Sequence, residues 1–168
     1  MDAVVCGIDP GLSTTGYAVV RGDSQRLRVL DAGVFRFPRG DTLPRRLLAV
    51  EHDLEALFLE HTPLCVAVEE LYSHYARPRT SILMGHARGV ILLAAARQGL
   101  EVRSYPATRI KRRLTGNGQA TKAQVQRAVQ RALGLDQLPE PADLADALAI
   151  ALCCVQDVRQ PALSGATR

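Results

Sequence analysis

Acidic residues end two apolar stretches of the sequence and recur in a third segment further along the chain. Asp9 follows one apolar run, Glu69 and Glu70 follow another, and Asp143 and Asp146 are spaced three residues apart. That spacing puts the last two acids on one face of a helix. The two apolar runs predict buried strands that carry a carboxylate to their C-terminal tip, where open α/β sheets place their chemistry.

These carboxylates cannot gather without a counter-charge. Each like-charged pair about 4 Å apart costs on the order of 4 kcal/mol at an effective dielectric of about 20, so a divalent cation is the expected solution. Because the ligands are oxygen atoms and no His or Cys has metal-ligand spacing, we expect Mg²⁺, with Mn²⁺ able to substitute. Two such ions per site can activate a water molecule and stabilise the leaving oxygen in phosphodiester hydrolysis.

Basic residues cluster in one part of the chain, which has a net charge of +4 and a pI of about 9.1. The cluster holds both lysines of the protein and comprises Arg109, Lys111, Arg112, Arg113, Lys122, Arg127 and Arg131. Next to the acids, it would hold the backbone phosphates of a nucleic acid. The mixed segment from Leu71 to Arg79 is predicted to be a loop, and its side chains, Tyr72 and Arg79 among them, are suited to stacking on bases or binding phosphate.

Simpler interpretations stay open for each of these groups. Asp9 can cap a turn, Asp143 can cap the last helix while Asp146 is solvated, and the basic cluster can form a solvated helix face. The spacing also does not choose between Glu69 and Glu70, because neighbouring residues of a strand point to opposite faces of the sheet.

The elements that must position these groups form an α/β pattern. Strands are predicted at 4–9, 17–20, 27–37, 64–68 and 100–105, and helices at 42–61, 79–98, 107–114, 122–133 and 142–155. The first three strands form an antiparallel meander, and the crossover rule puts the first and fourth strands side by side. The fold class is therefore α/β, with a mixed five-stranded sheet of three antiparallel and two parallel strands, flanked by helices.

Local sequence also predicts how several helices begin and pack. Asp41 and Thr42 are expected to cap the first long helix, and Thr121 forms a capping box with the glutamine three residues later. The small residues Gly85 and Gly89 allow another element to approach the second helix closely. We favour packing on the chain's own sheet over a dimer face, because that is the more common use of such residues.

The length of 168 residues predicts one domain at 1–155, followed by a polar, flexible tail at 156–168. No apolar run approaches the roughly 20 residues of a membrane span, and no signal peptide is apparent, so we expect a cytoplasmic protein. The four cysteines lie in apolar segments without Cys-x-x-Cys spacing and are predicted to be reduced and buried.

Several motifs together resemble the RuvC-type Holliday junction resolvases, endonucleases of the ribonuclease H-like superfamily. The resemblance runs from Val4 to about Leu152. It rests on Gly7-Ile8-Asp9-Pro10-Gly11, Thr15-Gly16-Tyr17, Val68-Glu69, Gly85-x-Ala87-Arg88-Gly89-Val90 and Asp143-x-x-Asp146-Ala147-Leu148-Ala149-Ile150.

The resemblance implies a role for each candidate residue. Asp9, Glu69, Asp143 and Asp146 would be the catalytic metal ligands, with Glu69 rather than Glu70 in the site. Lys111 and Lys122 match positions that the family uses on DNA near the scissile phosphate. Tyr72 falls where the family carries an aromatic residue that stacks on unpaired bases. The remaining DNA-binding candidates are Arg79, Arg109 and Arg112.

The resemblance also implies an activity and its partners. A homodimer would make paired symmetric nicks in a four-way DNA junction during recombination and repair, together with a RuvA and RuvB branch-migration complex. Two other interpretations compete with this one. The first loop also looks like that of actin-like kinases, but those need two such lobes and this chain holds one. A structural protein that binds branched DNA explains the basic cluster and Tyr72, but not acids at the ends of two strands.

Overall fold

The chain folds around one mixed β-sheet, seen in a computed structural model that describes residues 3–22, 26–37, 40–71 and 78–159. Its strands are β1 (Ala3–Asp9), β2 (Thr14–Gly22), β3 (Leu27–Arg36), β4 (Cys65–Glu69) and β5 (Glu101–Tyr105). They lie in the order β3-β2-β1-β4-β5. The pairs β1 with β2 and β2 with β3 are antiparallel, whereas β4 is parallel to β1 and β5 is parallel to β4. The predicted mixed sheet, with its first and fourth strands adjacent, is confirmed.

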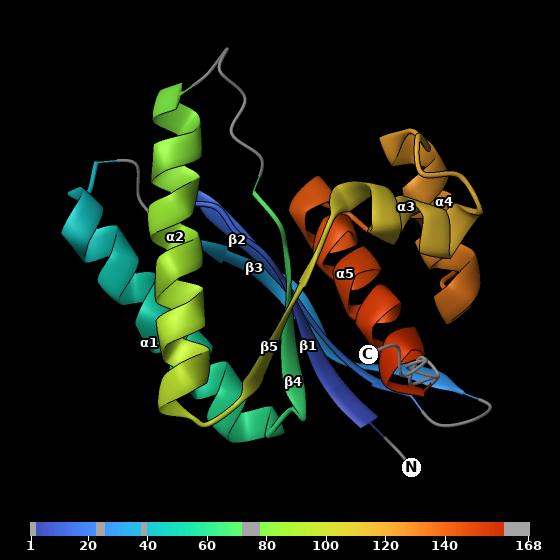
Figure 1. The fold of residues 1–168 in the computed structure, drawn as a ribbon, viewed down its shortest axis with the longest axis horizontal. Coiled ribbons are helices and arrows are strands. Elements are labelled where there is room, and N and C mark those ends of the chain that lie inside the picture. The colour runs from blue at the N-terminus through green and yellow to red at the C-terminus, as the bar shows by residue number, and fades with distance from the viewer. Residues whose placement is uncertain (1–2, 23–25, 38–39, 72–77, 160–168) are drawn as a thin grey trace, which may run out of the picture.

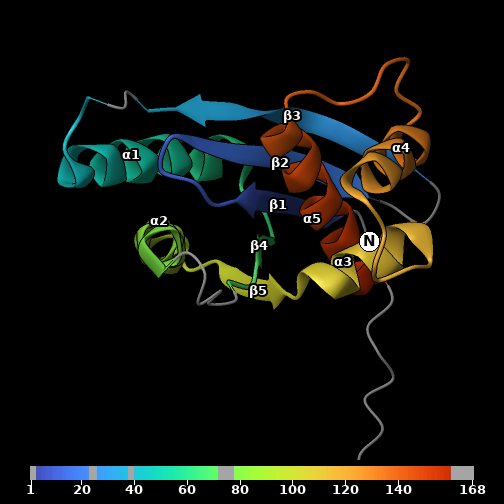
Figure 2. The same cartoon turned by 90° about the horizontal axis from the view of Figure 1, so that it is seen from above.

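Helices cover both faces of this sheet (Figure 1). On one side lie α1 (Leu43–His61) and α2 (Pro78–Arg97). On the other lie α3 (Ala107–Thr115), α4 (Lys122–Leu133) and α5 (Ala142–Arg159). The view from above separates the same two groups (Figure 2). Among these helices α5 contacts β1 and β2 directly, so it is the helix that brings its own residues closest to the centre of the sheet.

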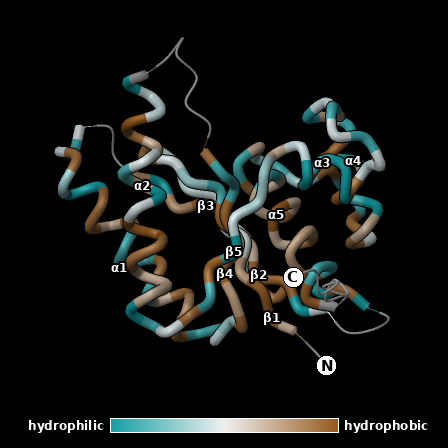
Figure 3. Tube along the Cα trace, in the orientation of Figure 1, coloured by the Kyte–Doolittle hydropathy of each residue, from teal (hydrophilic) through white to brown (hydrophobic). Residues whose placement is uncertain are grey.

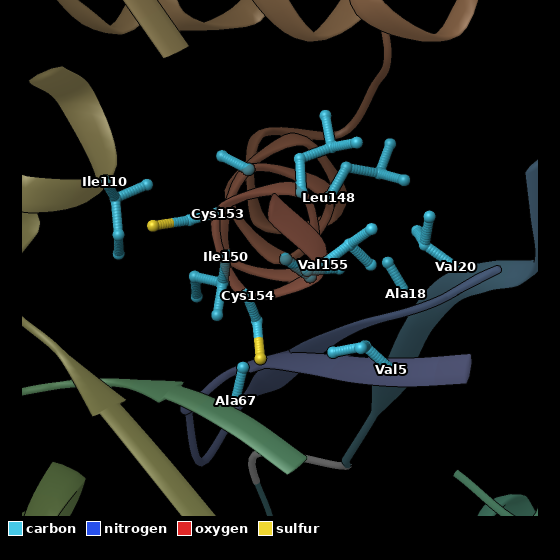
Figure 4. Packing of buried hydrophobic residues seen from close by; sticks show 14 of the residues in the cluster. Val5, Ala18, Val20, Ala67, Ile110, Leu148, Ile150, Cys153, Cys154 and Val155 are labelled. Carbon is cyan, nitrogen blue, oxygen red and sulfur yellow. The ribbon is translucent and has the colours of Figure 1, made fainter. Parts of the chain in front are cut away.

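Successive residues of β1 and β4 pack into two separate cores. Val5, Cys65 and Ala67 pack against α5, whereas Ile8 and Val68 belong to the cluster with α1 and α2. Figure 4 shows the α5 side, where Cys154 of α5 points toward Ala67 and lies near Val5. Hydrophobic residues therefore occupy both faces of the central strands. Brown, hydrophobic stretches run along β1 and β4 in the coloured chain trace (Figure 3).

Several element ends differ from those predicted. β2 begins at Thr14 rather than Tyr17, because Gly16 pairs with Asp9 and Thr14 pairs with Arg36, which extends the ladder into the predicted turn. α5 continues to Arg159, four residues into the predicted tail. The remaining tail residues, 160–168, lie outside the described part.

Both predicted helix caps are in place, but only the one at Thr121 is closed by side-chain hydrogen bonds. The Thr121 hydroxyl accepts a hydrogen bond from the backbone N–H of Gln124 at 3.3 Å, and the Gln124 side chain accepts one from the backbone N–H of Thr121 at 2.8 Å. Thr42 is the N-cap of α1, but its side chain makes no capping hydrogen bond. The start of α1 therefore depends on its proline and on packing.

Gly85 and Gly89 do not pack on the sheet, contrary to our expectation. A Cβ atom added at either glycine would meet nothing within 4 Å. The helical period instead turns Ile91, Ala94 and Ala95 inward, where they belong to the core beneath α2. The two glycines lie on the outer side of the helix.

The other predictions from composition can be compared directly with the structure. All four cysteines are buried and free of disulfides, as expected. Among the described residues, none of the helices has the length and apolar character needed to span a bilayer.

Candidate active site

The parallel strands β1 and β4 each end in an acid at the same edge of the sheet. Their ladder pairs Ile8 with Val68, so Asp9 and Glu69 occupy the next position of the register. Strand residues alternate between faces, and Cys65 and Ala67 face α5; Glu69 therefore lies on the α5 side. Asp9 shares that side with Val5 for the same reason. The alternation assigns Glu70 to the opposite side, and its backbone N–H donates to the carbonyl oxygen of Tyr105 at 2.9 Å.

Two glycines let α5 lie directly on the strands. A Cβ atom on Gly7 would be 2.5 Å from the backbone oxygen of Ala147, and one on Gly16 would overlap the backbone carbonyl of Asp143. Gly16 is also the residue paired with Asp9 across β1 and β2. The first turn of α5, which carries Asp143, therefore lies over the strand position opposite Asp9.

Asp9, Glu69, Asp143 and Asp146 together form what we term the acidic edge. The pKa of Asp9 is raised to about 8, first by burial and then by the charges of Asp146, Glu69 and Asp143, while the charge of Lys122 lowers it. Burial and then the charge of Asp146 raise the pKa of Glu69. The four predicted acids thus act on one another electrostatically, although they come from three separate elements.

Two lysines supply positive charge to the acidic edge. The Nζ of Lys122 donates to Oδ2 of Asp146 at 3.1 Å, and this contact raises the pKa of Lys122. The charge of Lys111 lowers the pKa of Glu69. Both lysines were predicted to contact DNA, and both lie beside the carboxylates.

A buried threonine supports the turn that follows Asp9. The Thr15 side chain has no exposed surface. Its hydroxyl donates to the carbonyl oxygen of Gly11 at 2.6 Å and accepts from the N–H of Gly11 at 3.4 Å. Thr15 therefore holds the loop closed just beyond the acid. It was absent from the predicted site residues, although the run Thr14-Thr15-Gly16 beside the glycine turn offered a signal.

The other DNA-binding candidates occupy different surroundings. Arg79 is exposed in the first turn of α2, and Arg112 is exposed on α3. Arg109 forms an ion pair with Asp157 at 2.6 Å and lies 5.2 Å from the ring centre of Tyr105, so its guanidinium holds α3 against α5. Tyr72 lies outside the described residues.

The chemistry of the acidic edge suits a metal ion, but its side chains are not arranged as a ready metal-binding group. Within the described ranges, no three His, Cys, Asp or Glu side chains form a ready metal-binding group. The donors of the acidic edge are nevertheless all carboxylate oxygens, which suit a hard divalent cation. Burial and the carboxylates of Asp146, Glu69 and Asp143 raise the pKa of the half-buried Asp9, and Lys122 contacts Asp146, so this edge carries an excess of negative charge. The residues therefore fit a hard divalent cation, which these carboxylates would hold.

The sheet order, with acids at the ends of β1 and β4 and on the helix that crosses them, defines the ribonuclease H-like class of nucleases. The family model described as "Crossover junction endodeoxyribonuclease RuvC" matches residues 5–154. A protein of that name from Rhodopirellula baltica is 54% identical over 149 residues, which cover 89% of this chain and 84% of the relative. The chain belongs to the RuvC family of crossover junction endodeoxyribonucleases.

Solved structures agree with that assignment. The Thermus thermophilus RuvC structure matches with a TM-score of 0.86 and 34% identity, covering 94% of this chain and 96% of the other. T. thermophilus RuvC in complex with Holliday junction substrate matches with a TM-score of 0.88 and 32% identity, over 95% and 96% of the two chains. The predicted family, the ribonuclease H-like fold and the enzyme class are confirmed.

Proposed function

We propose that this chain resolves four-way DNA junctions by paired, symmetric phosphodiester nicks during recombination and repair, and that it acts in the cytoplasm. The observation that carries the proposal is the acidic edge, where acids from β1, β4 and α5 meet beside Lys111 and Lys122. Carboxylates alone would repel a nucleic acid. With positive charge added, the same edge can hold a phosphodiester.

The proposed catalytic ligands of the metal are Asp9, Glu69, Asp143 and Asp146. Their oxygen donors favour Mg²⁺ or Mn²⁺, and four carboxylates provide enough negative charge for two ions. Such ions would supply an activated water and stabilisation of the leaving oxygen. The chain's own part is to present the four acids on one side of the sheet.

Lys111 and Lys122 are proposed to hold the phosphates on either side of the cut. Each lies close enough to the acidic edge to shift the pKa of a carboxylate, so a phosphate that touches either lysine is also near the acids. Arg79 and Arg112, both exposed, are proposed as further backbone contacts, and Tyr72 as the residue that stacks on an unpaired base. Arg109 would have to give up its ion pair with Asp157 to bind a phosphate with its full charge.

A homodimer is proposed through the outer side of α2. Ile82 and Leu93 are 62% and 52% exposed there, and Gly85 and Gly89 lie between them on the same stripe. A flat apolar stripe with glycines lets two copies of a helix approach closely. A four-way junction is roughly two-fold symmetric, so a two-fold dimer offers one site to each of two opposed strands. A RuvA and RuvB complex is proposed as the partner on the family resemblance.

The test is cleavage of a synthetic mobile four-way junction, compared with a linear duplex of the same sequence. Each substrate is incubated with Mg²⁺, Mn²⁺ or EDTA, and the products are mapped on a denaturing gel. Paired nicks at symmetric positions, in the junction only and only with metal, are expected. Tight binding of the junction without cleavage in either metal would contradict the proposal and point to an architectural protein.

A further inference from the structure

A second polar feature lies between α3 and α4, and it contains no acid. A pocket of about 310 Å³ opens there. Its polar lining comes from Thr115, Asn117, Gln124, Arg127 and Arg131. Because one water molecule occupies about 30 Å³ in the liquid, the pocket has room for a small hydrated group. Figure 1 shows both helices at the end of the molecule opposite α1 and α2.

The pocket is separate from the acidic edge, although α4 contributes to both. Successive helical residues are about 100° apart, so Gln124, Arg127 and Arg131 share one side of α4. Lys122, which contacts Asp146, is roughly 140° or more away from each of them around the helix axis. The pocket and the carboxylates therefore face different directions.

The side-chain amides that line the pocket use their oxygen atoms as hydrogen-bond acceptors. The side-chain oxygen of Asn117 accepts from the backbone N–H of Gln119 at 2.9 Å, and that of Gln124 accepts from the backbone N–H of Thr121 at 2.8 Å. Both amides consequently have their NH₂ groups left to donate. The Thr115 hydroxyl already donates to the carbonyl oxygen of Lys111 at 2.8 Å. A ligand here meets amide and guanidinium donors.

The two arginines of the pocket are not neutralised. Arg127 and Arg131 are exposed and have no ion pair within the described residues, whereas Arg109 and Arg113 are both paired with Asp157. No acidic residue occurs in the sequence between positions 102 and 135. Like charges four residues apart destabilise a helix by about 0.2–0.5 kcal/mol, so this pair weakens α4 slightly. An anion would remove that repulsion.

We propose that this pocket binds one backbone phosphate of a duplex arm of the DNA, at a distance from the phosphate that is cut. The inference rests on the proposed function and adds a contact to it. Guanidinium groups bind phosphate oxygens in bidentate fashion, and the amides of Asn117 and Gln124 supply further donors. A small phosphate compound presents the same chemistry, so the test must separate it from the DNA backbone.

The experiment measures junction binding by fluorescence anisotropy in EDTA, from about 50 to 300 mM salt. The test variant combines Arg127→Gln with Arg131→Gln. The matched control combines Arg28→Gln on β3 with Arg45→Gln on α1, which removes the same charge elsewhere. Losing one phosphate contact should lower the slope of log K against log salt by about one and weaken binding roughly tenfold at about 0.1 M salt.

Equal effects in the test and control variants would overturn the inference, because overall charge would then explain both. A second measurement titrates the protein with inorganic phosphate and follows backbone amide resonances of residues 115–131. One outcome would assign the pocket to a small phosphate compound and overturn the DNA assignment. In that outcome, phosphate shifts the amide resonances of the wild type in a saturable way but not those of the test variant, while the test and control variants bind the junction equally. Wild-type cleavage is measured alongside and tests the proposed function independently. If the wild type does not prefer junctions over linear DNA, the slopes of log K against log salt for the test and control variants are compared on linear duplex instead.

Discussion

The Nζ of Lys122 lies 3.1 Å from Oδ2 of Asp146, so the first residue of α4 closes onto the first turns of α5. A lysine at a helix N-terminus opposes the helix dipole by a few tenths of a kcal/mol. At this position the Asp146 carboxylate offsets that cost, and Lys122 supplies positive charge that a bound cation would otherwise provide. The lysine and a metal ion therefore compete for the same acid.

Replacing Lys122 is expected to strengthen cation binding. In Lys122→Gln, Asp146 loses its partner, so the Tm in EDTA should fall by a few degrees at most, since the Lys122 side chain is 80% exposed. The concentration of Mg²⁺ or Mn²⁺ that gives half-maximal stabilisation should fall severalfold. Thermal unfolding during a metal titration measures both effects. Arg127→Gln, on the same helix but on the side away from Asp146, is the control. If the wild type and both variants reached half-maximal stabilisation at the same metal concentration, Lys122 and the metal would not compete for Asp146.

Asp9→Asn is expected to abolish cleavage while junction binding survives. The substitution removes a proposed metal ligand but keeps the size of the side chain and reduces negative charge next to the DNA. Cleavage is followed on a denaturing gel and binding by anisotropy in EDTA. If both were lost to the same extent, Asp9 would act in binding and its role as a metal ligand would be wrong.

The metal-free protein is expected to lose stability as the pH rises. Burial, with the neighbouring carboxylates, raises the pKa of Asp9 to about 8 in the folded state, against an ordinary value near 4 when unfolded. Between these values the folded chain holds the extra proton, so the free energy of unfolding falls from about pH 4 to about pH 8. Denaturant unfolding in EDTA across that range measures the slope.

The same experiment has a direct control in Asp9→Asn, which cannot titrate. At about pH 8 this variant should be more stable than the wild type by at least about 1 kcal/mol, because one pKa unit corresponds to about 1.4 kcal/mol. A wild-type slope that the variant retains would assign the titration to another group.

Gly16→Ala is expected to damage both the fold and the site. The new methyl group would overlap the carbonyl of Asp143, so α5 must shift away from β2. We expect a loss of about 1–3 kcal/mol in the free energy of unfolding, the usual cost of overpacking, and a larger proportional loss of cleavage than of binding. Gly40→Ala is the control, because a Cβ atom there would meet nothing within 4 Å. Equal stability of the two variants would mean that the close approach of α5 is not required.

A charge on the outer side of α2 is expected to separate the proposed dimer. Leu93→Arg places a guanidinium on the apolar stripe, where burial in an interface would leave it unpaired. Light scattering after size-exclusion chromatography should report a monomer. Leu48→Arg on α1 is the matched control, since Leu48 is 65% exposed and lies off the stripe. A dimer that persists in Leu93→Arg would exclude this face as the interface.

Much of the fold could be predicted from the sequence because its signals are local. An apolar run followed by Asp9 and a Pro-Gly turn specifies a buried strand and where it ends. Thr121 and Gln124 specify the start of α4 through their reciprocal hydrogen bonds. The spacing of Asp143 and Asp146 alone put both on one helical face. Each of these inferences depends only on residues a few positions apart in the sequence.

Only the tertiary structure decided which of the two neighbouring acids, Glu69 or Glu70, lies on the α5 side of the sheet. β4 is apolar on both faces, so its sequence lacks the alternation of apolar and polar residues that would distinguish Glu69 from Glu70. The choice follows from α5 covering the face of Val5 and Ala67. The contact of Lys122 with Asp146 was likewise beyond local reasoning, because it depends on how α4 docks on α5, and helix docking is set by side-chain packing between distant segments.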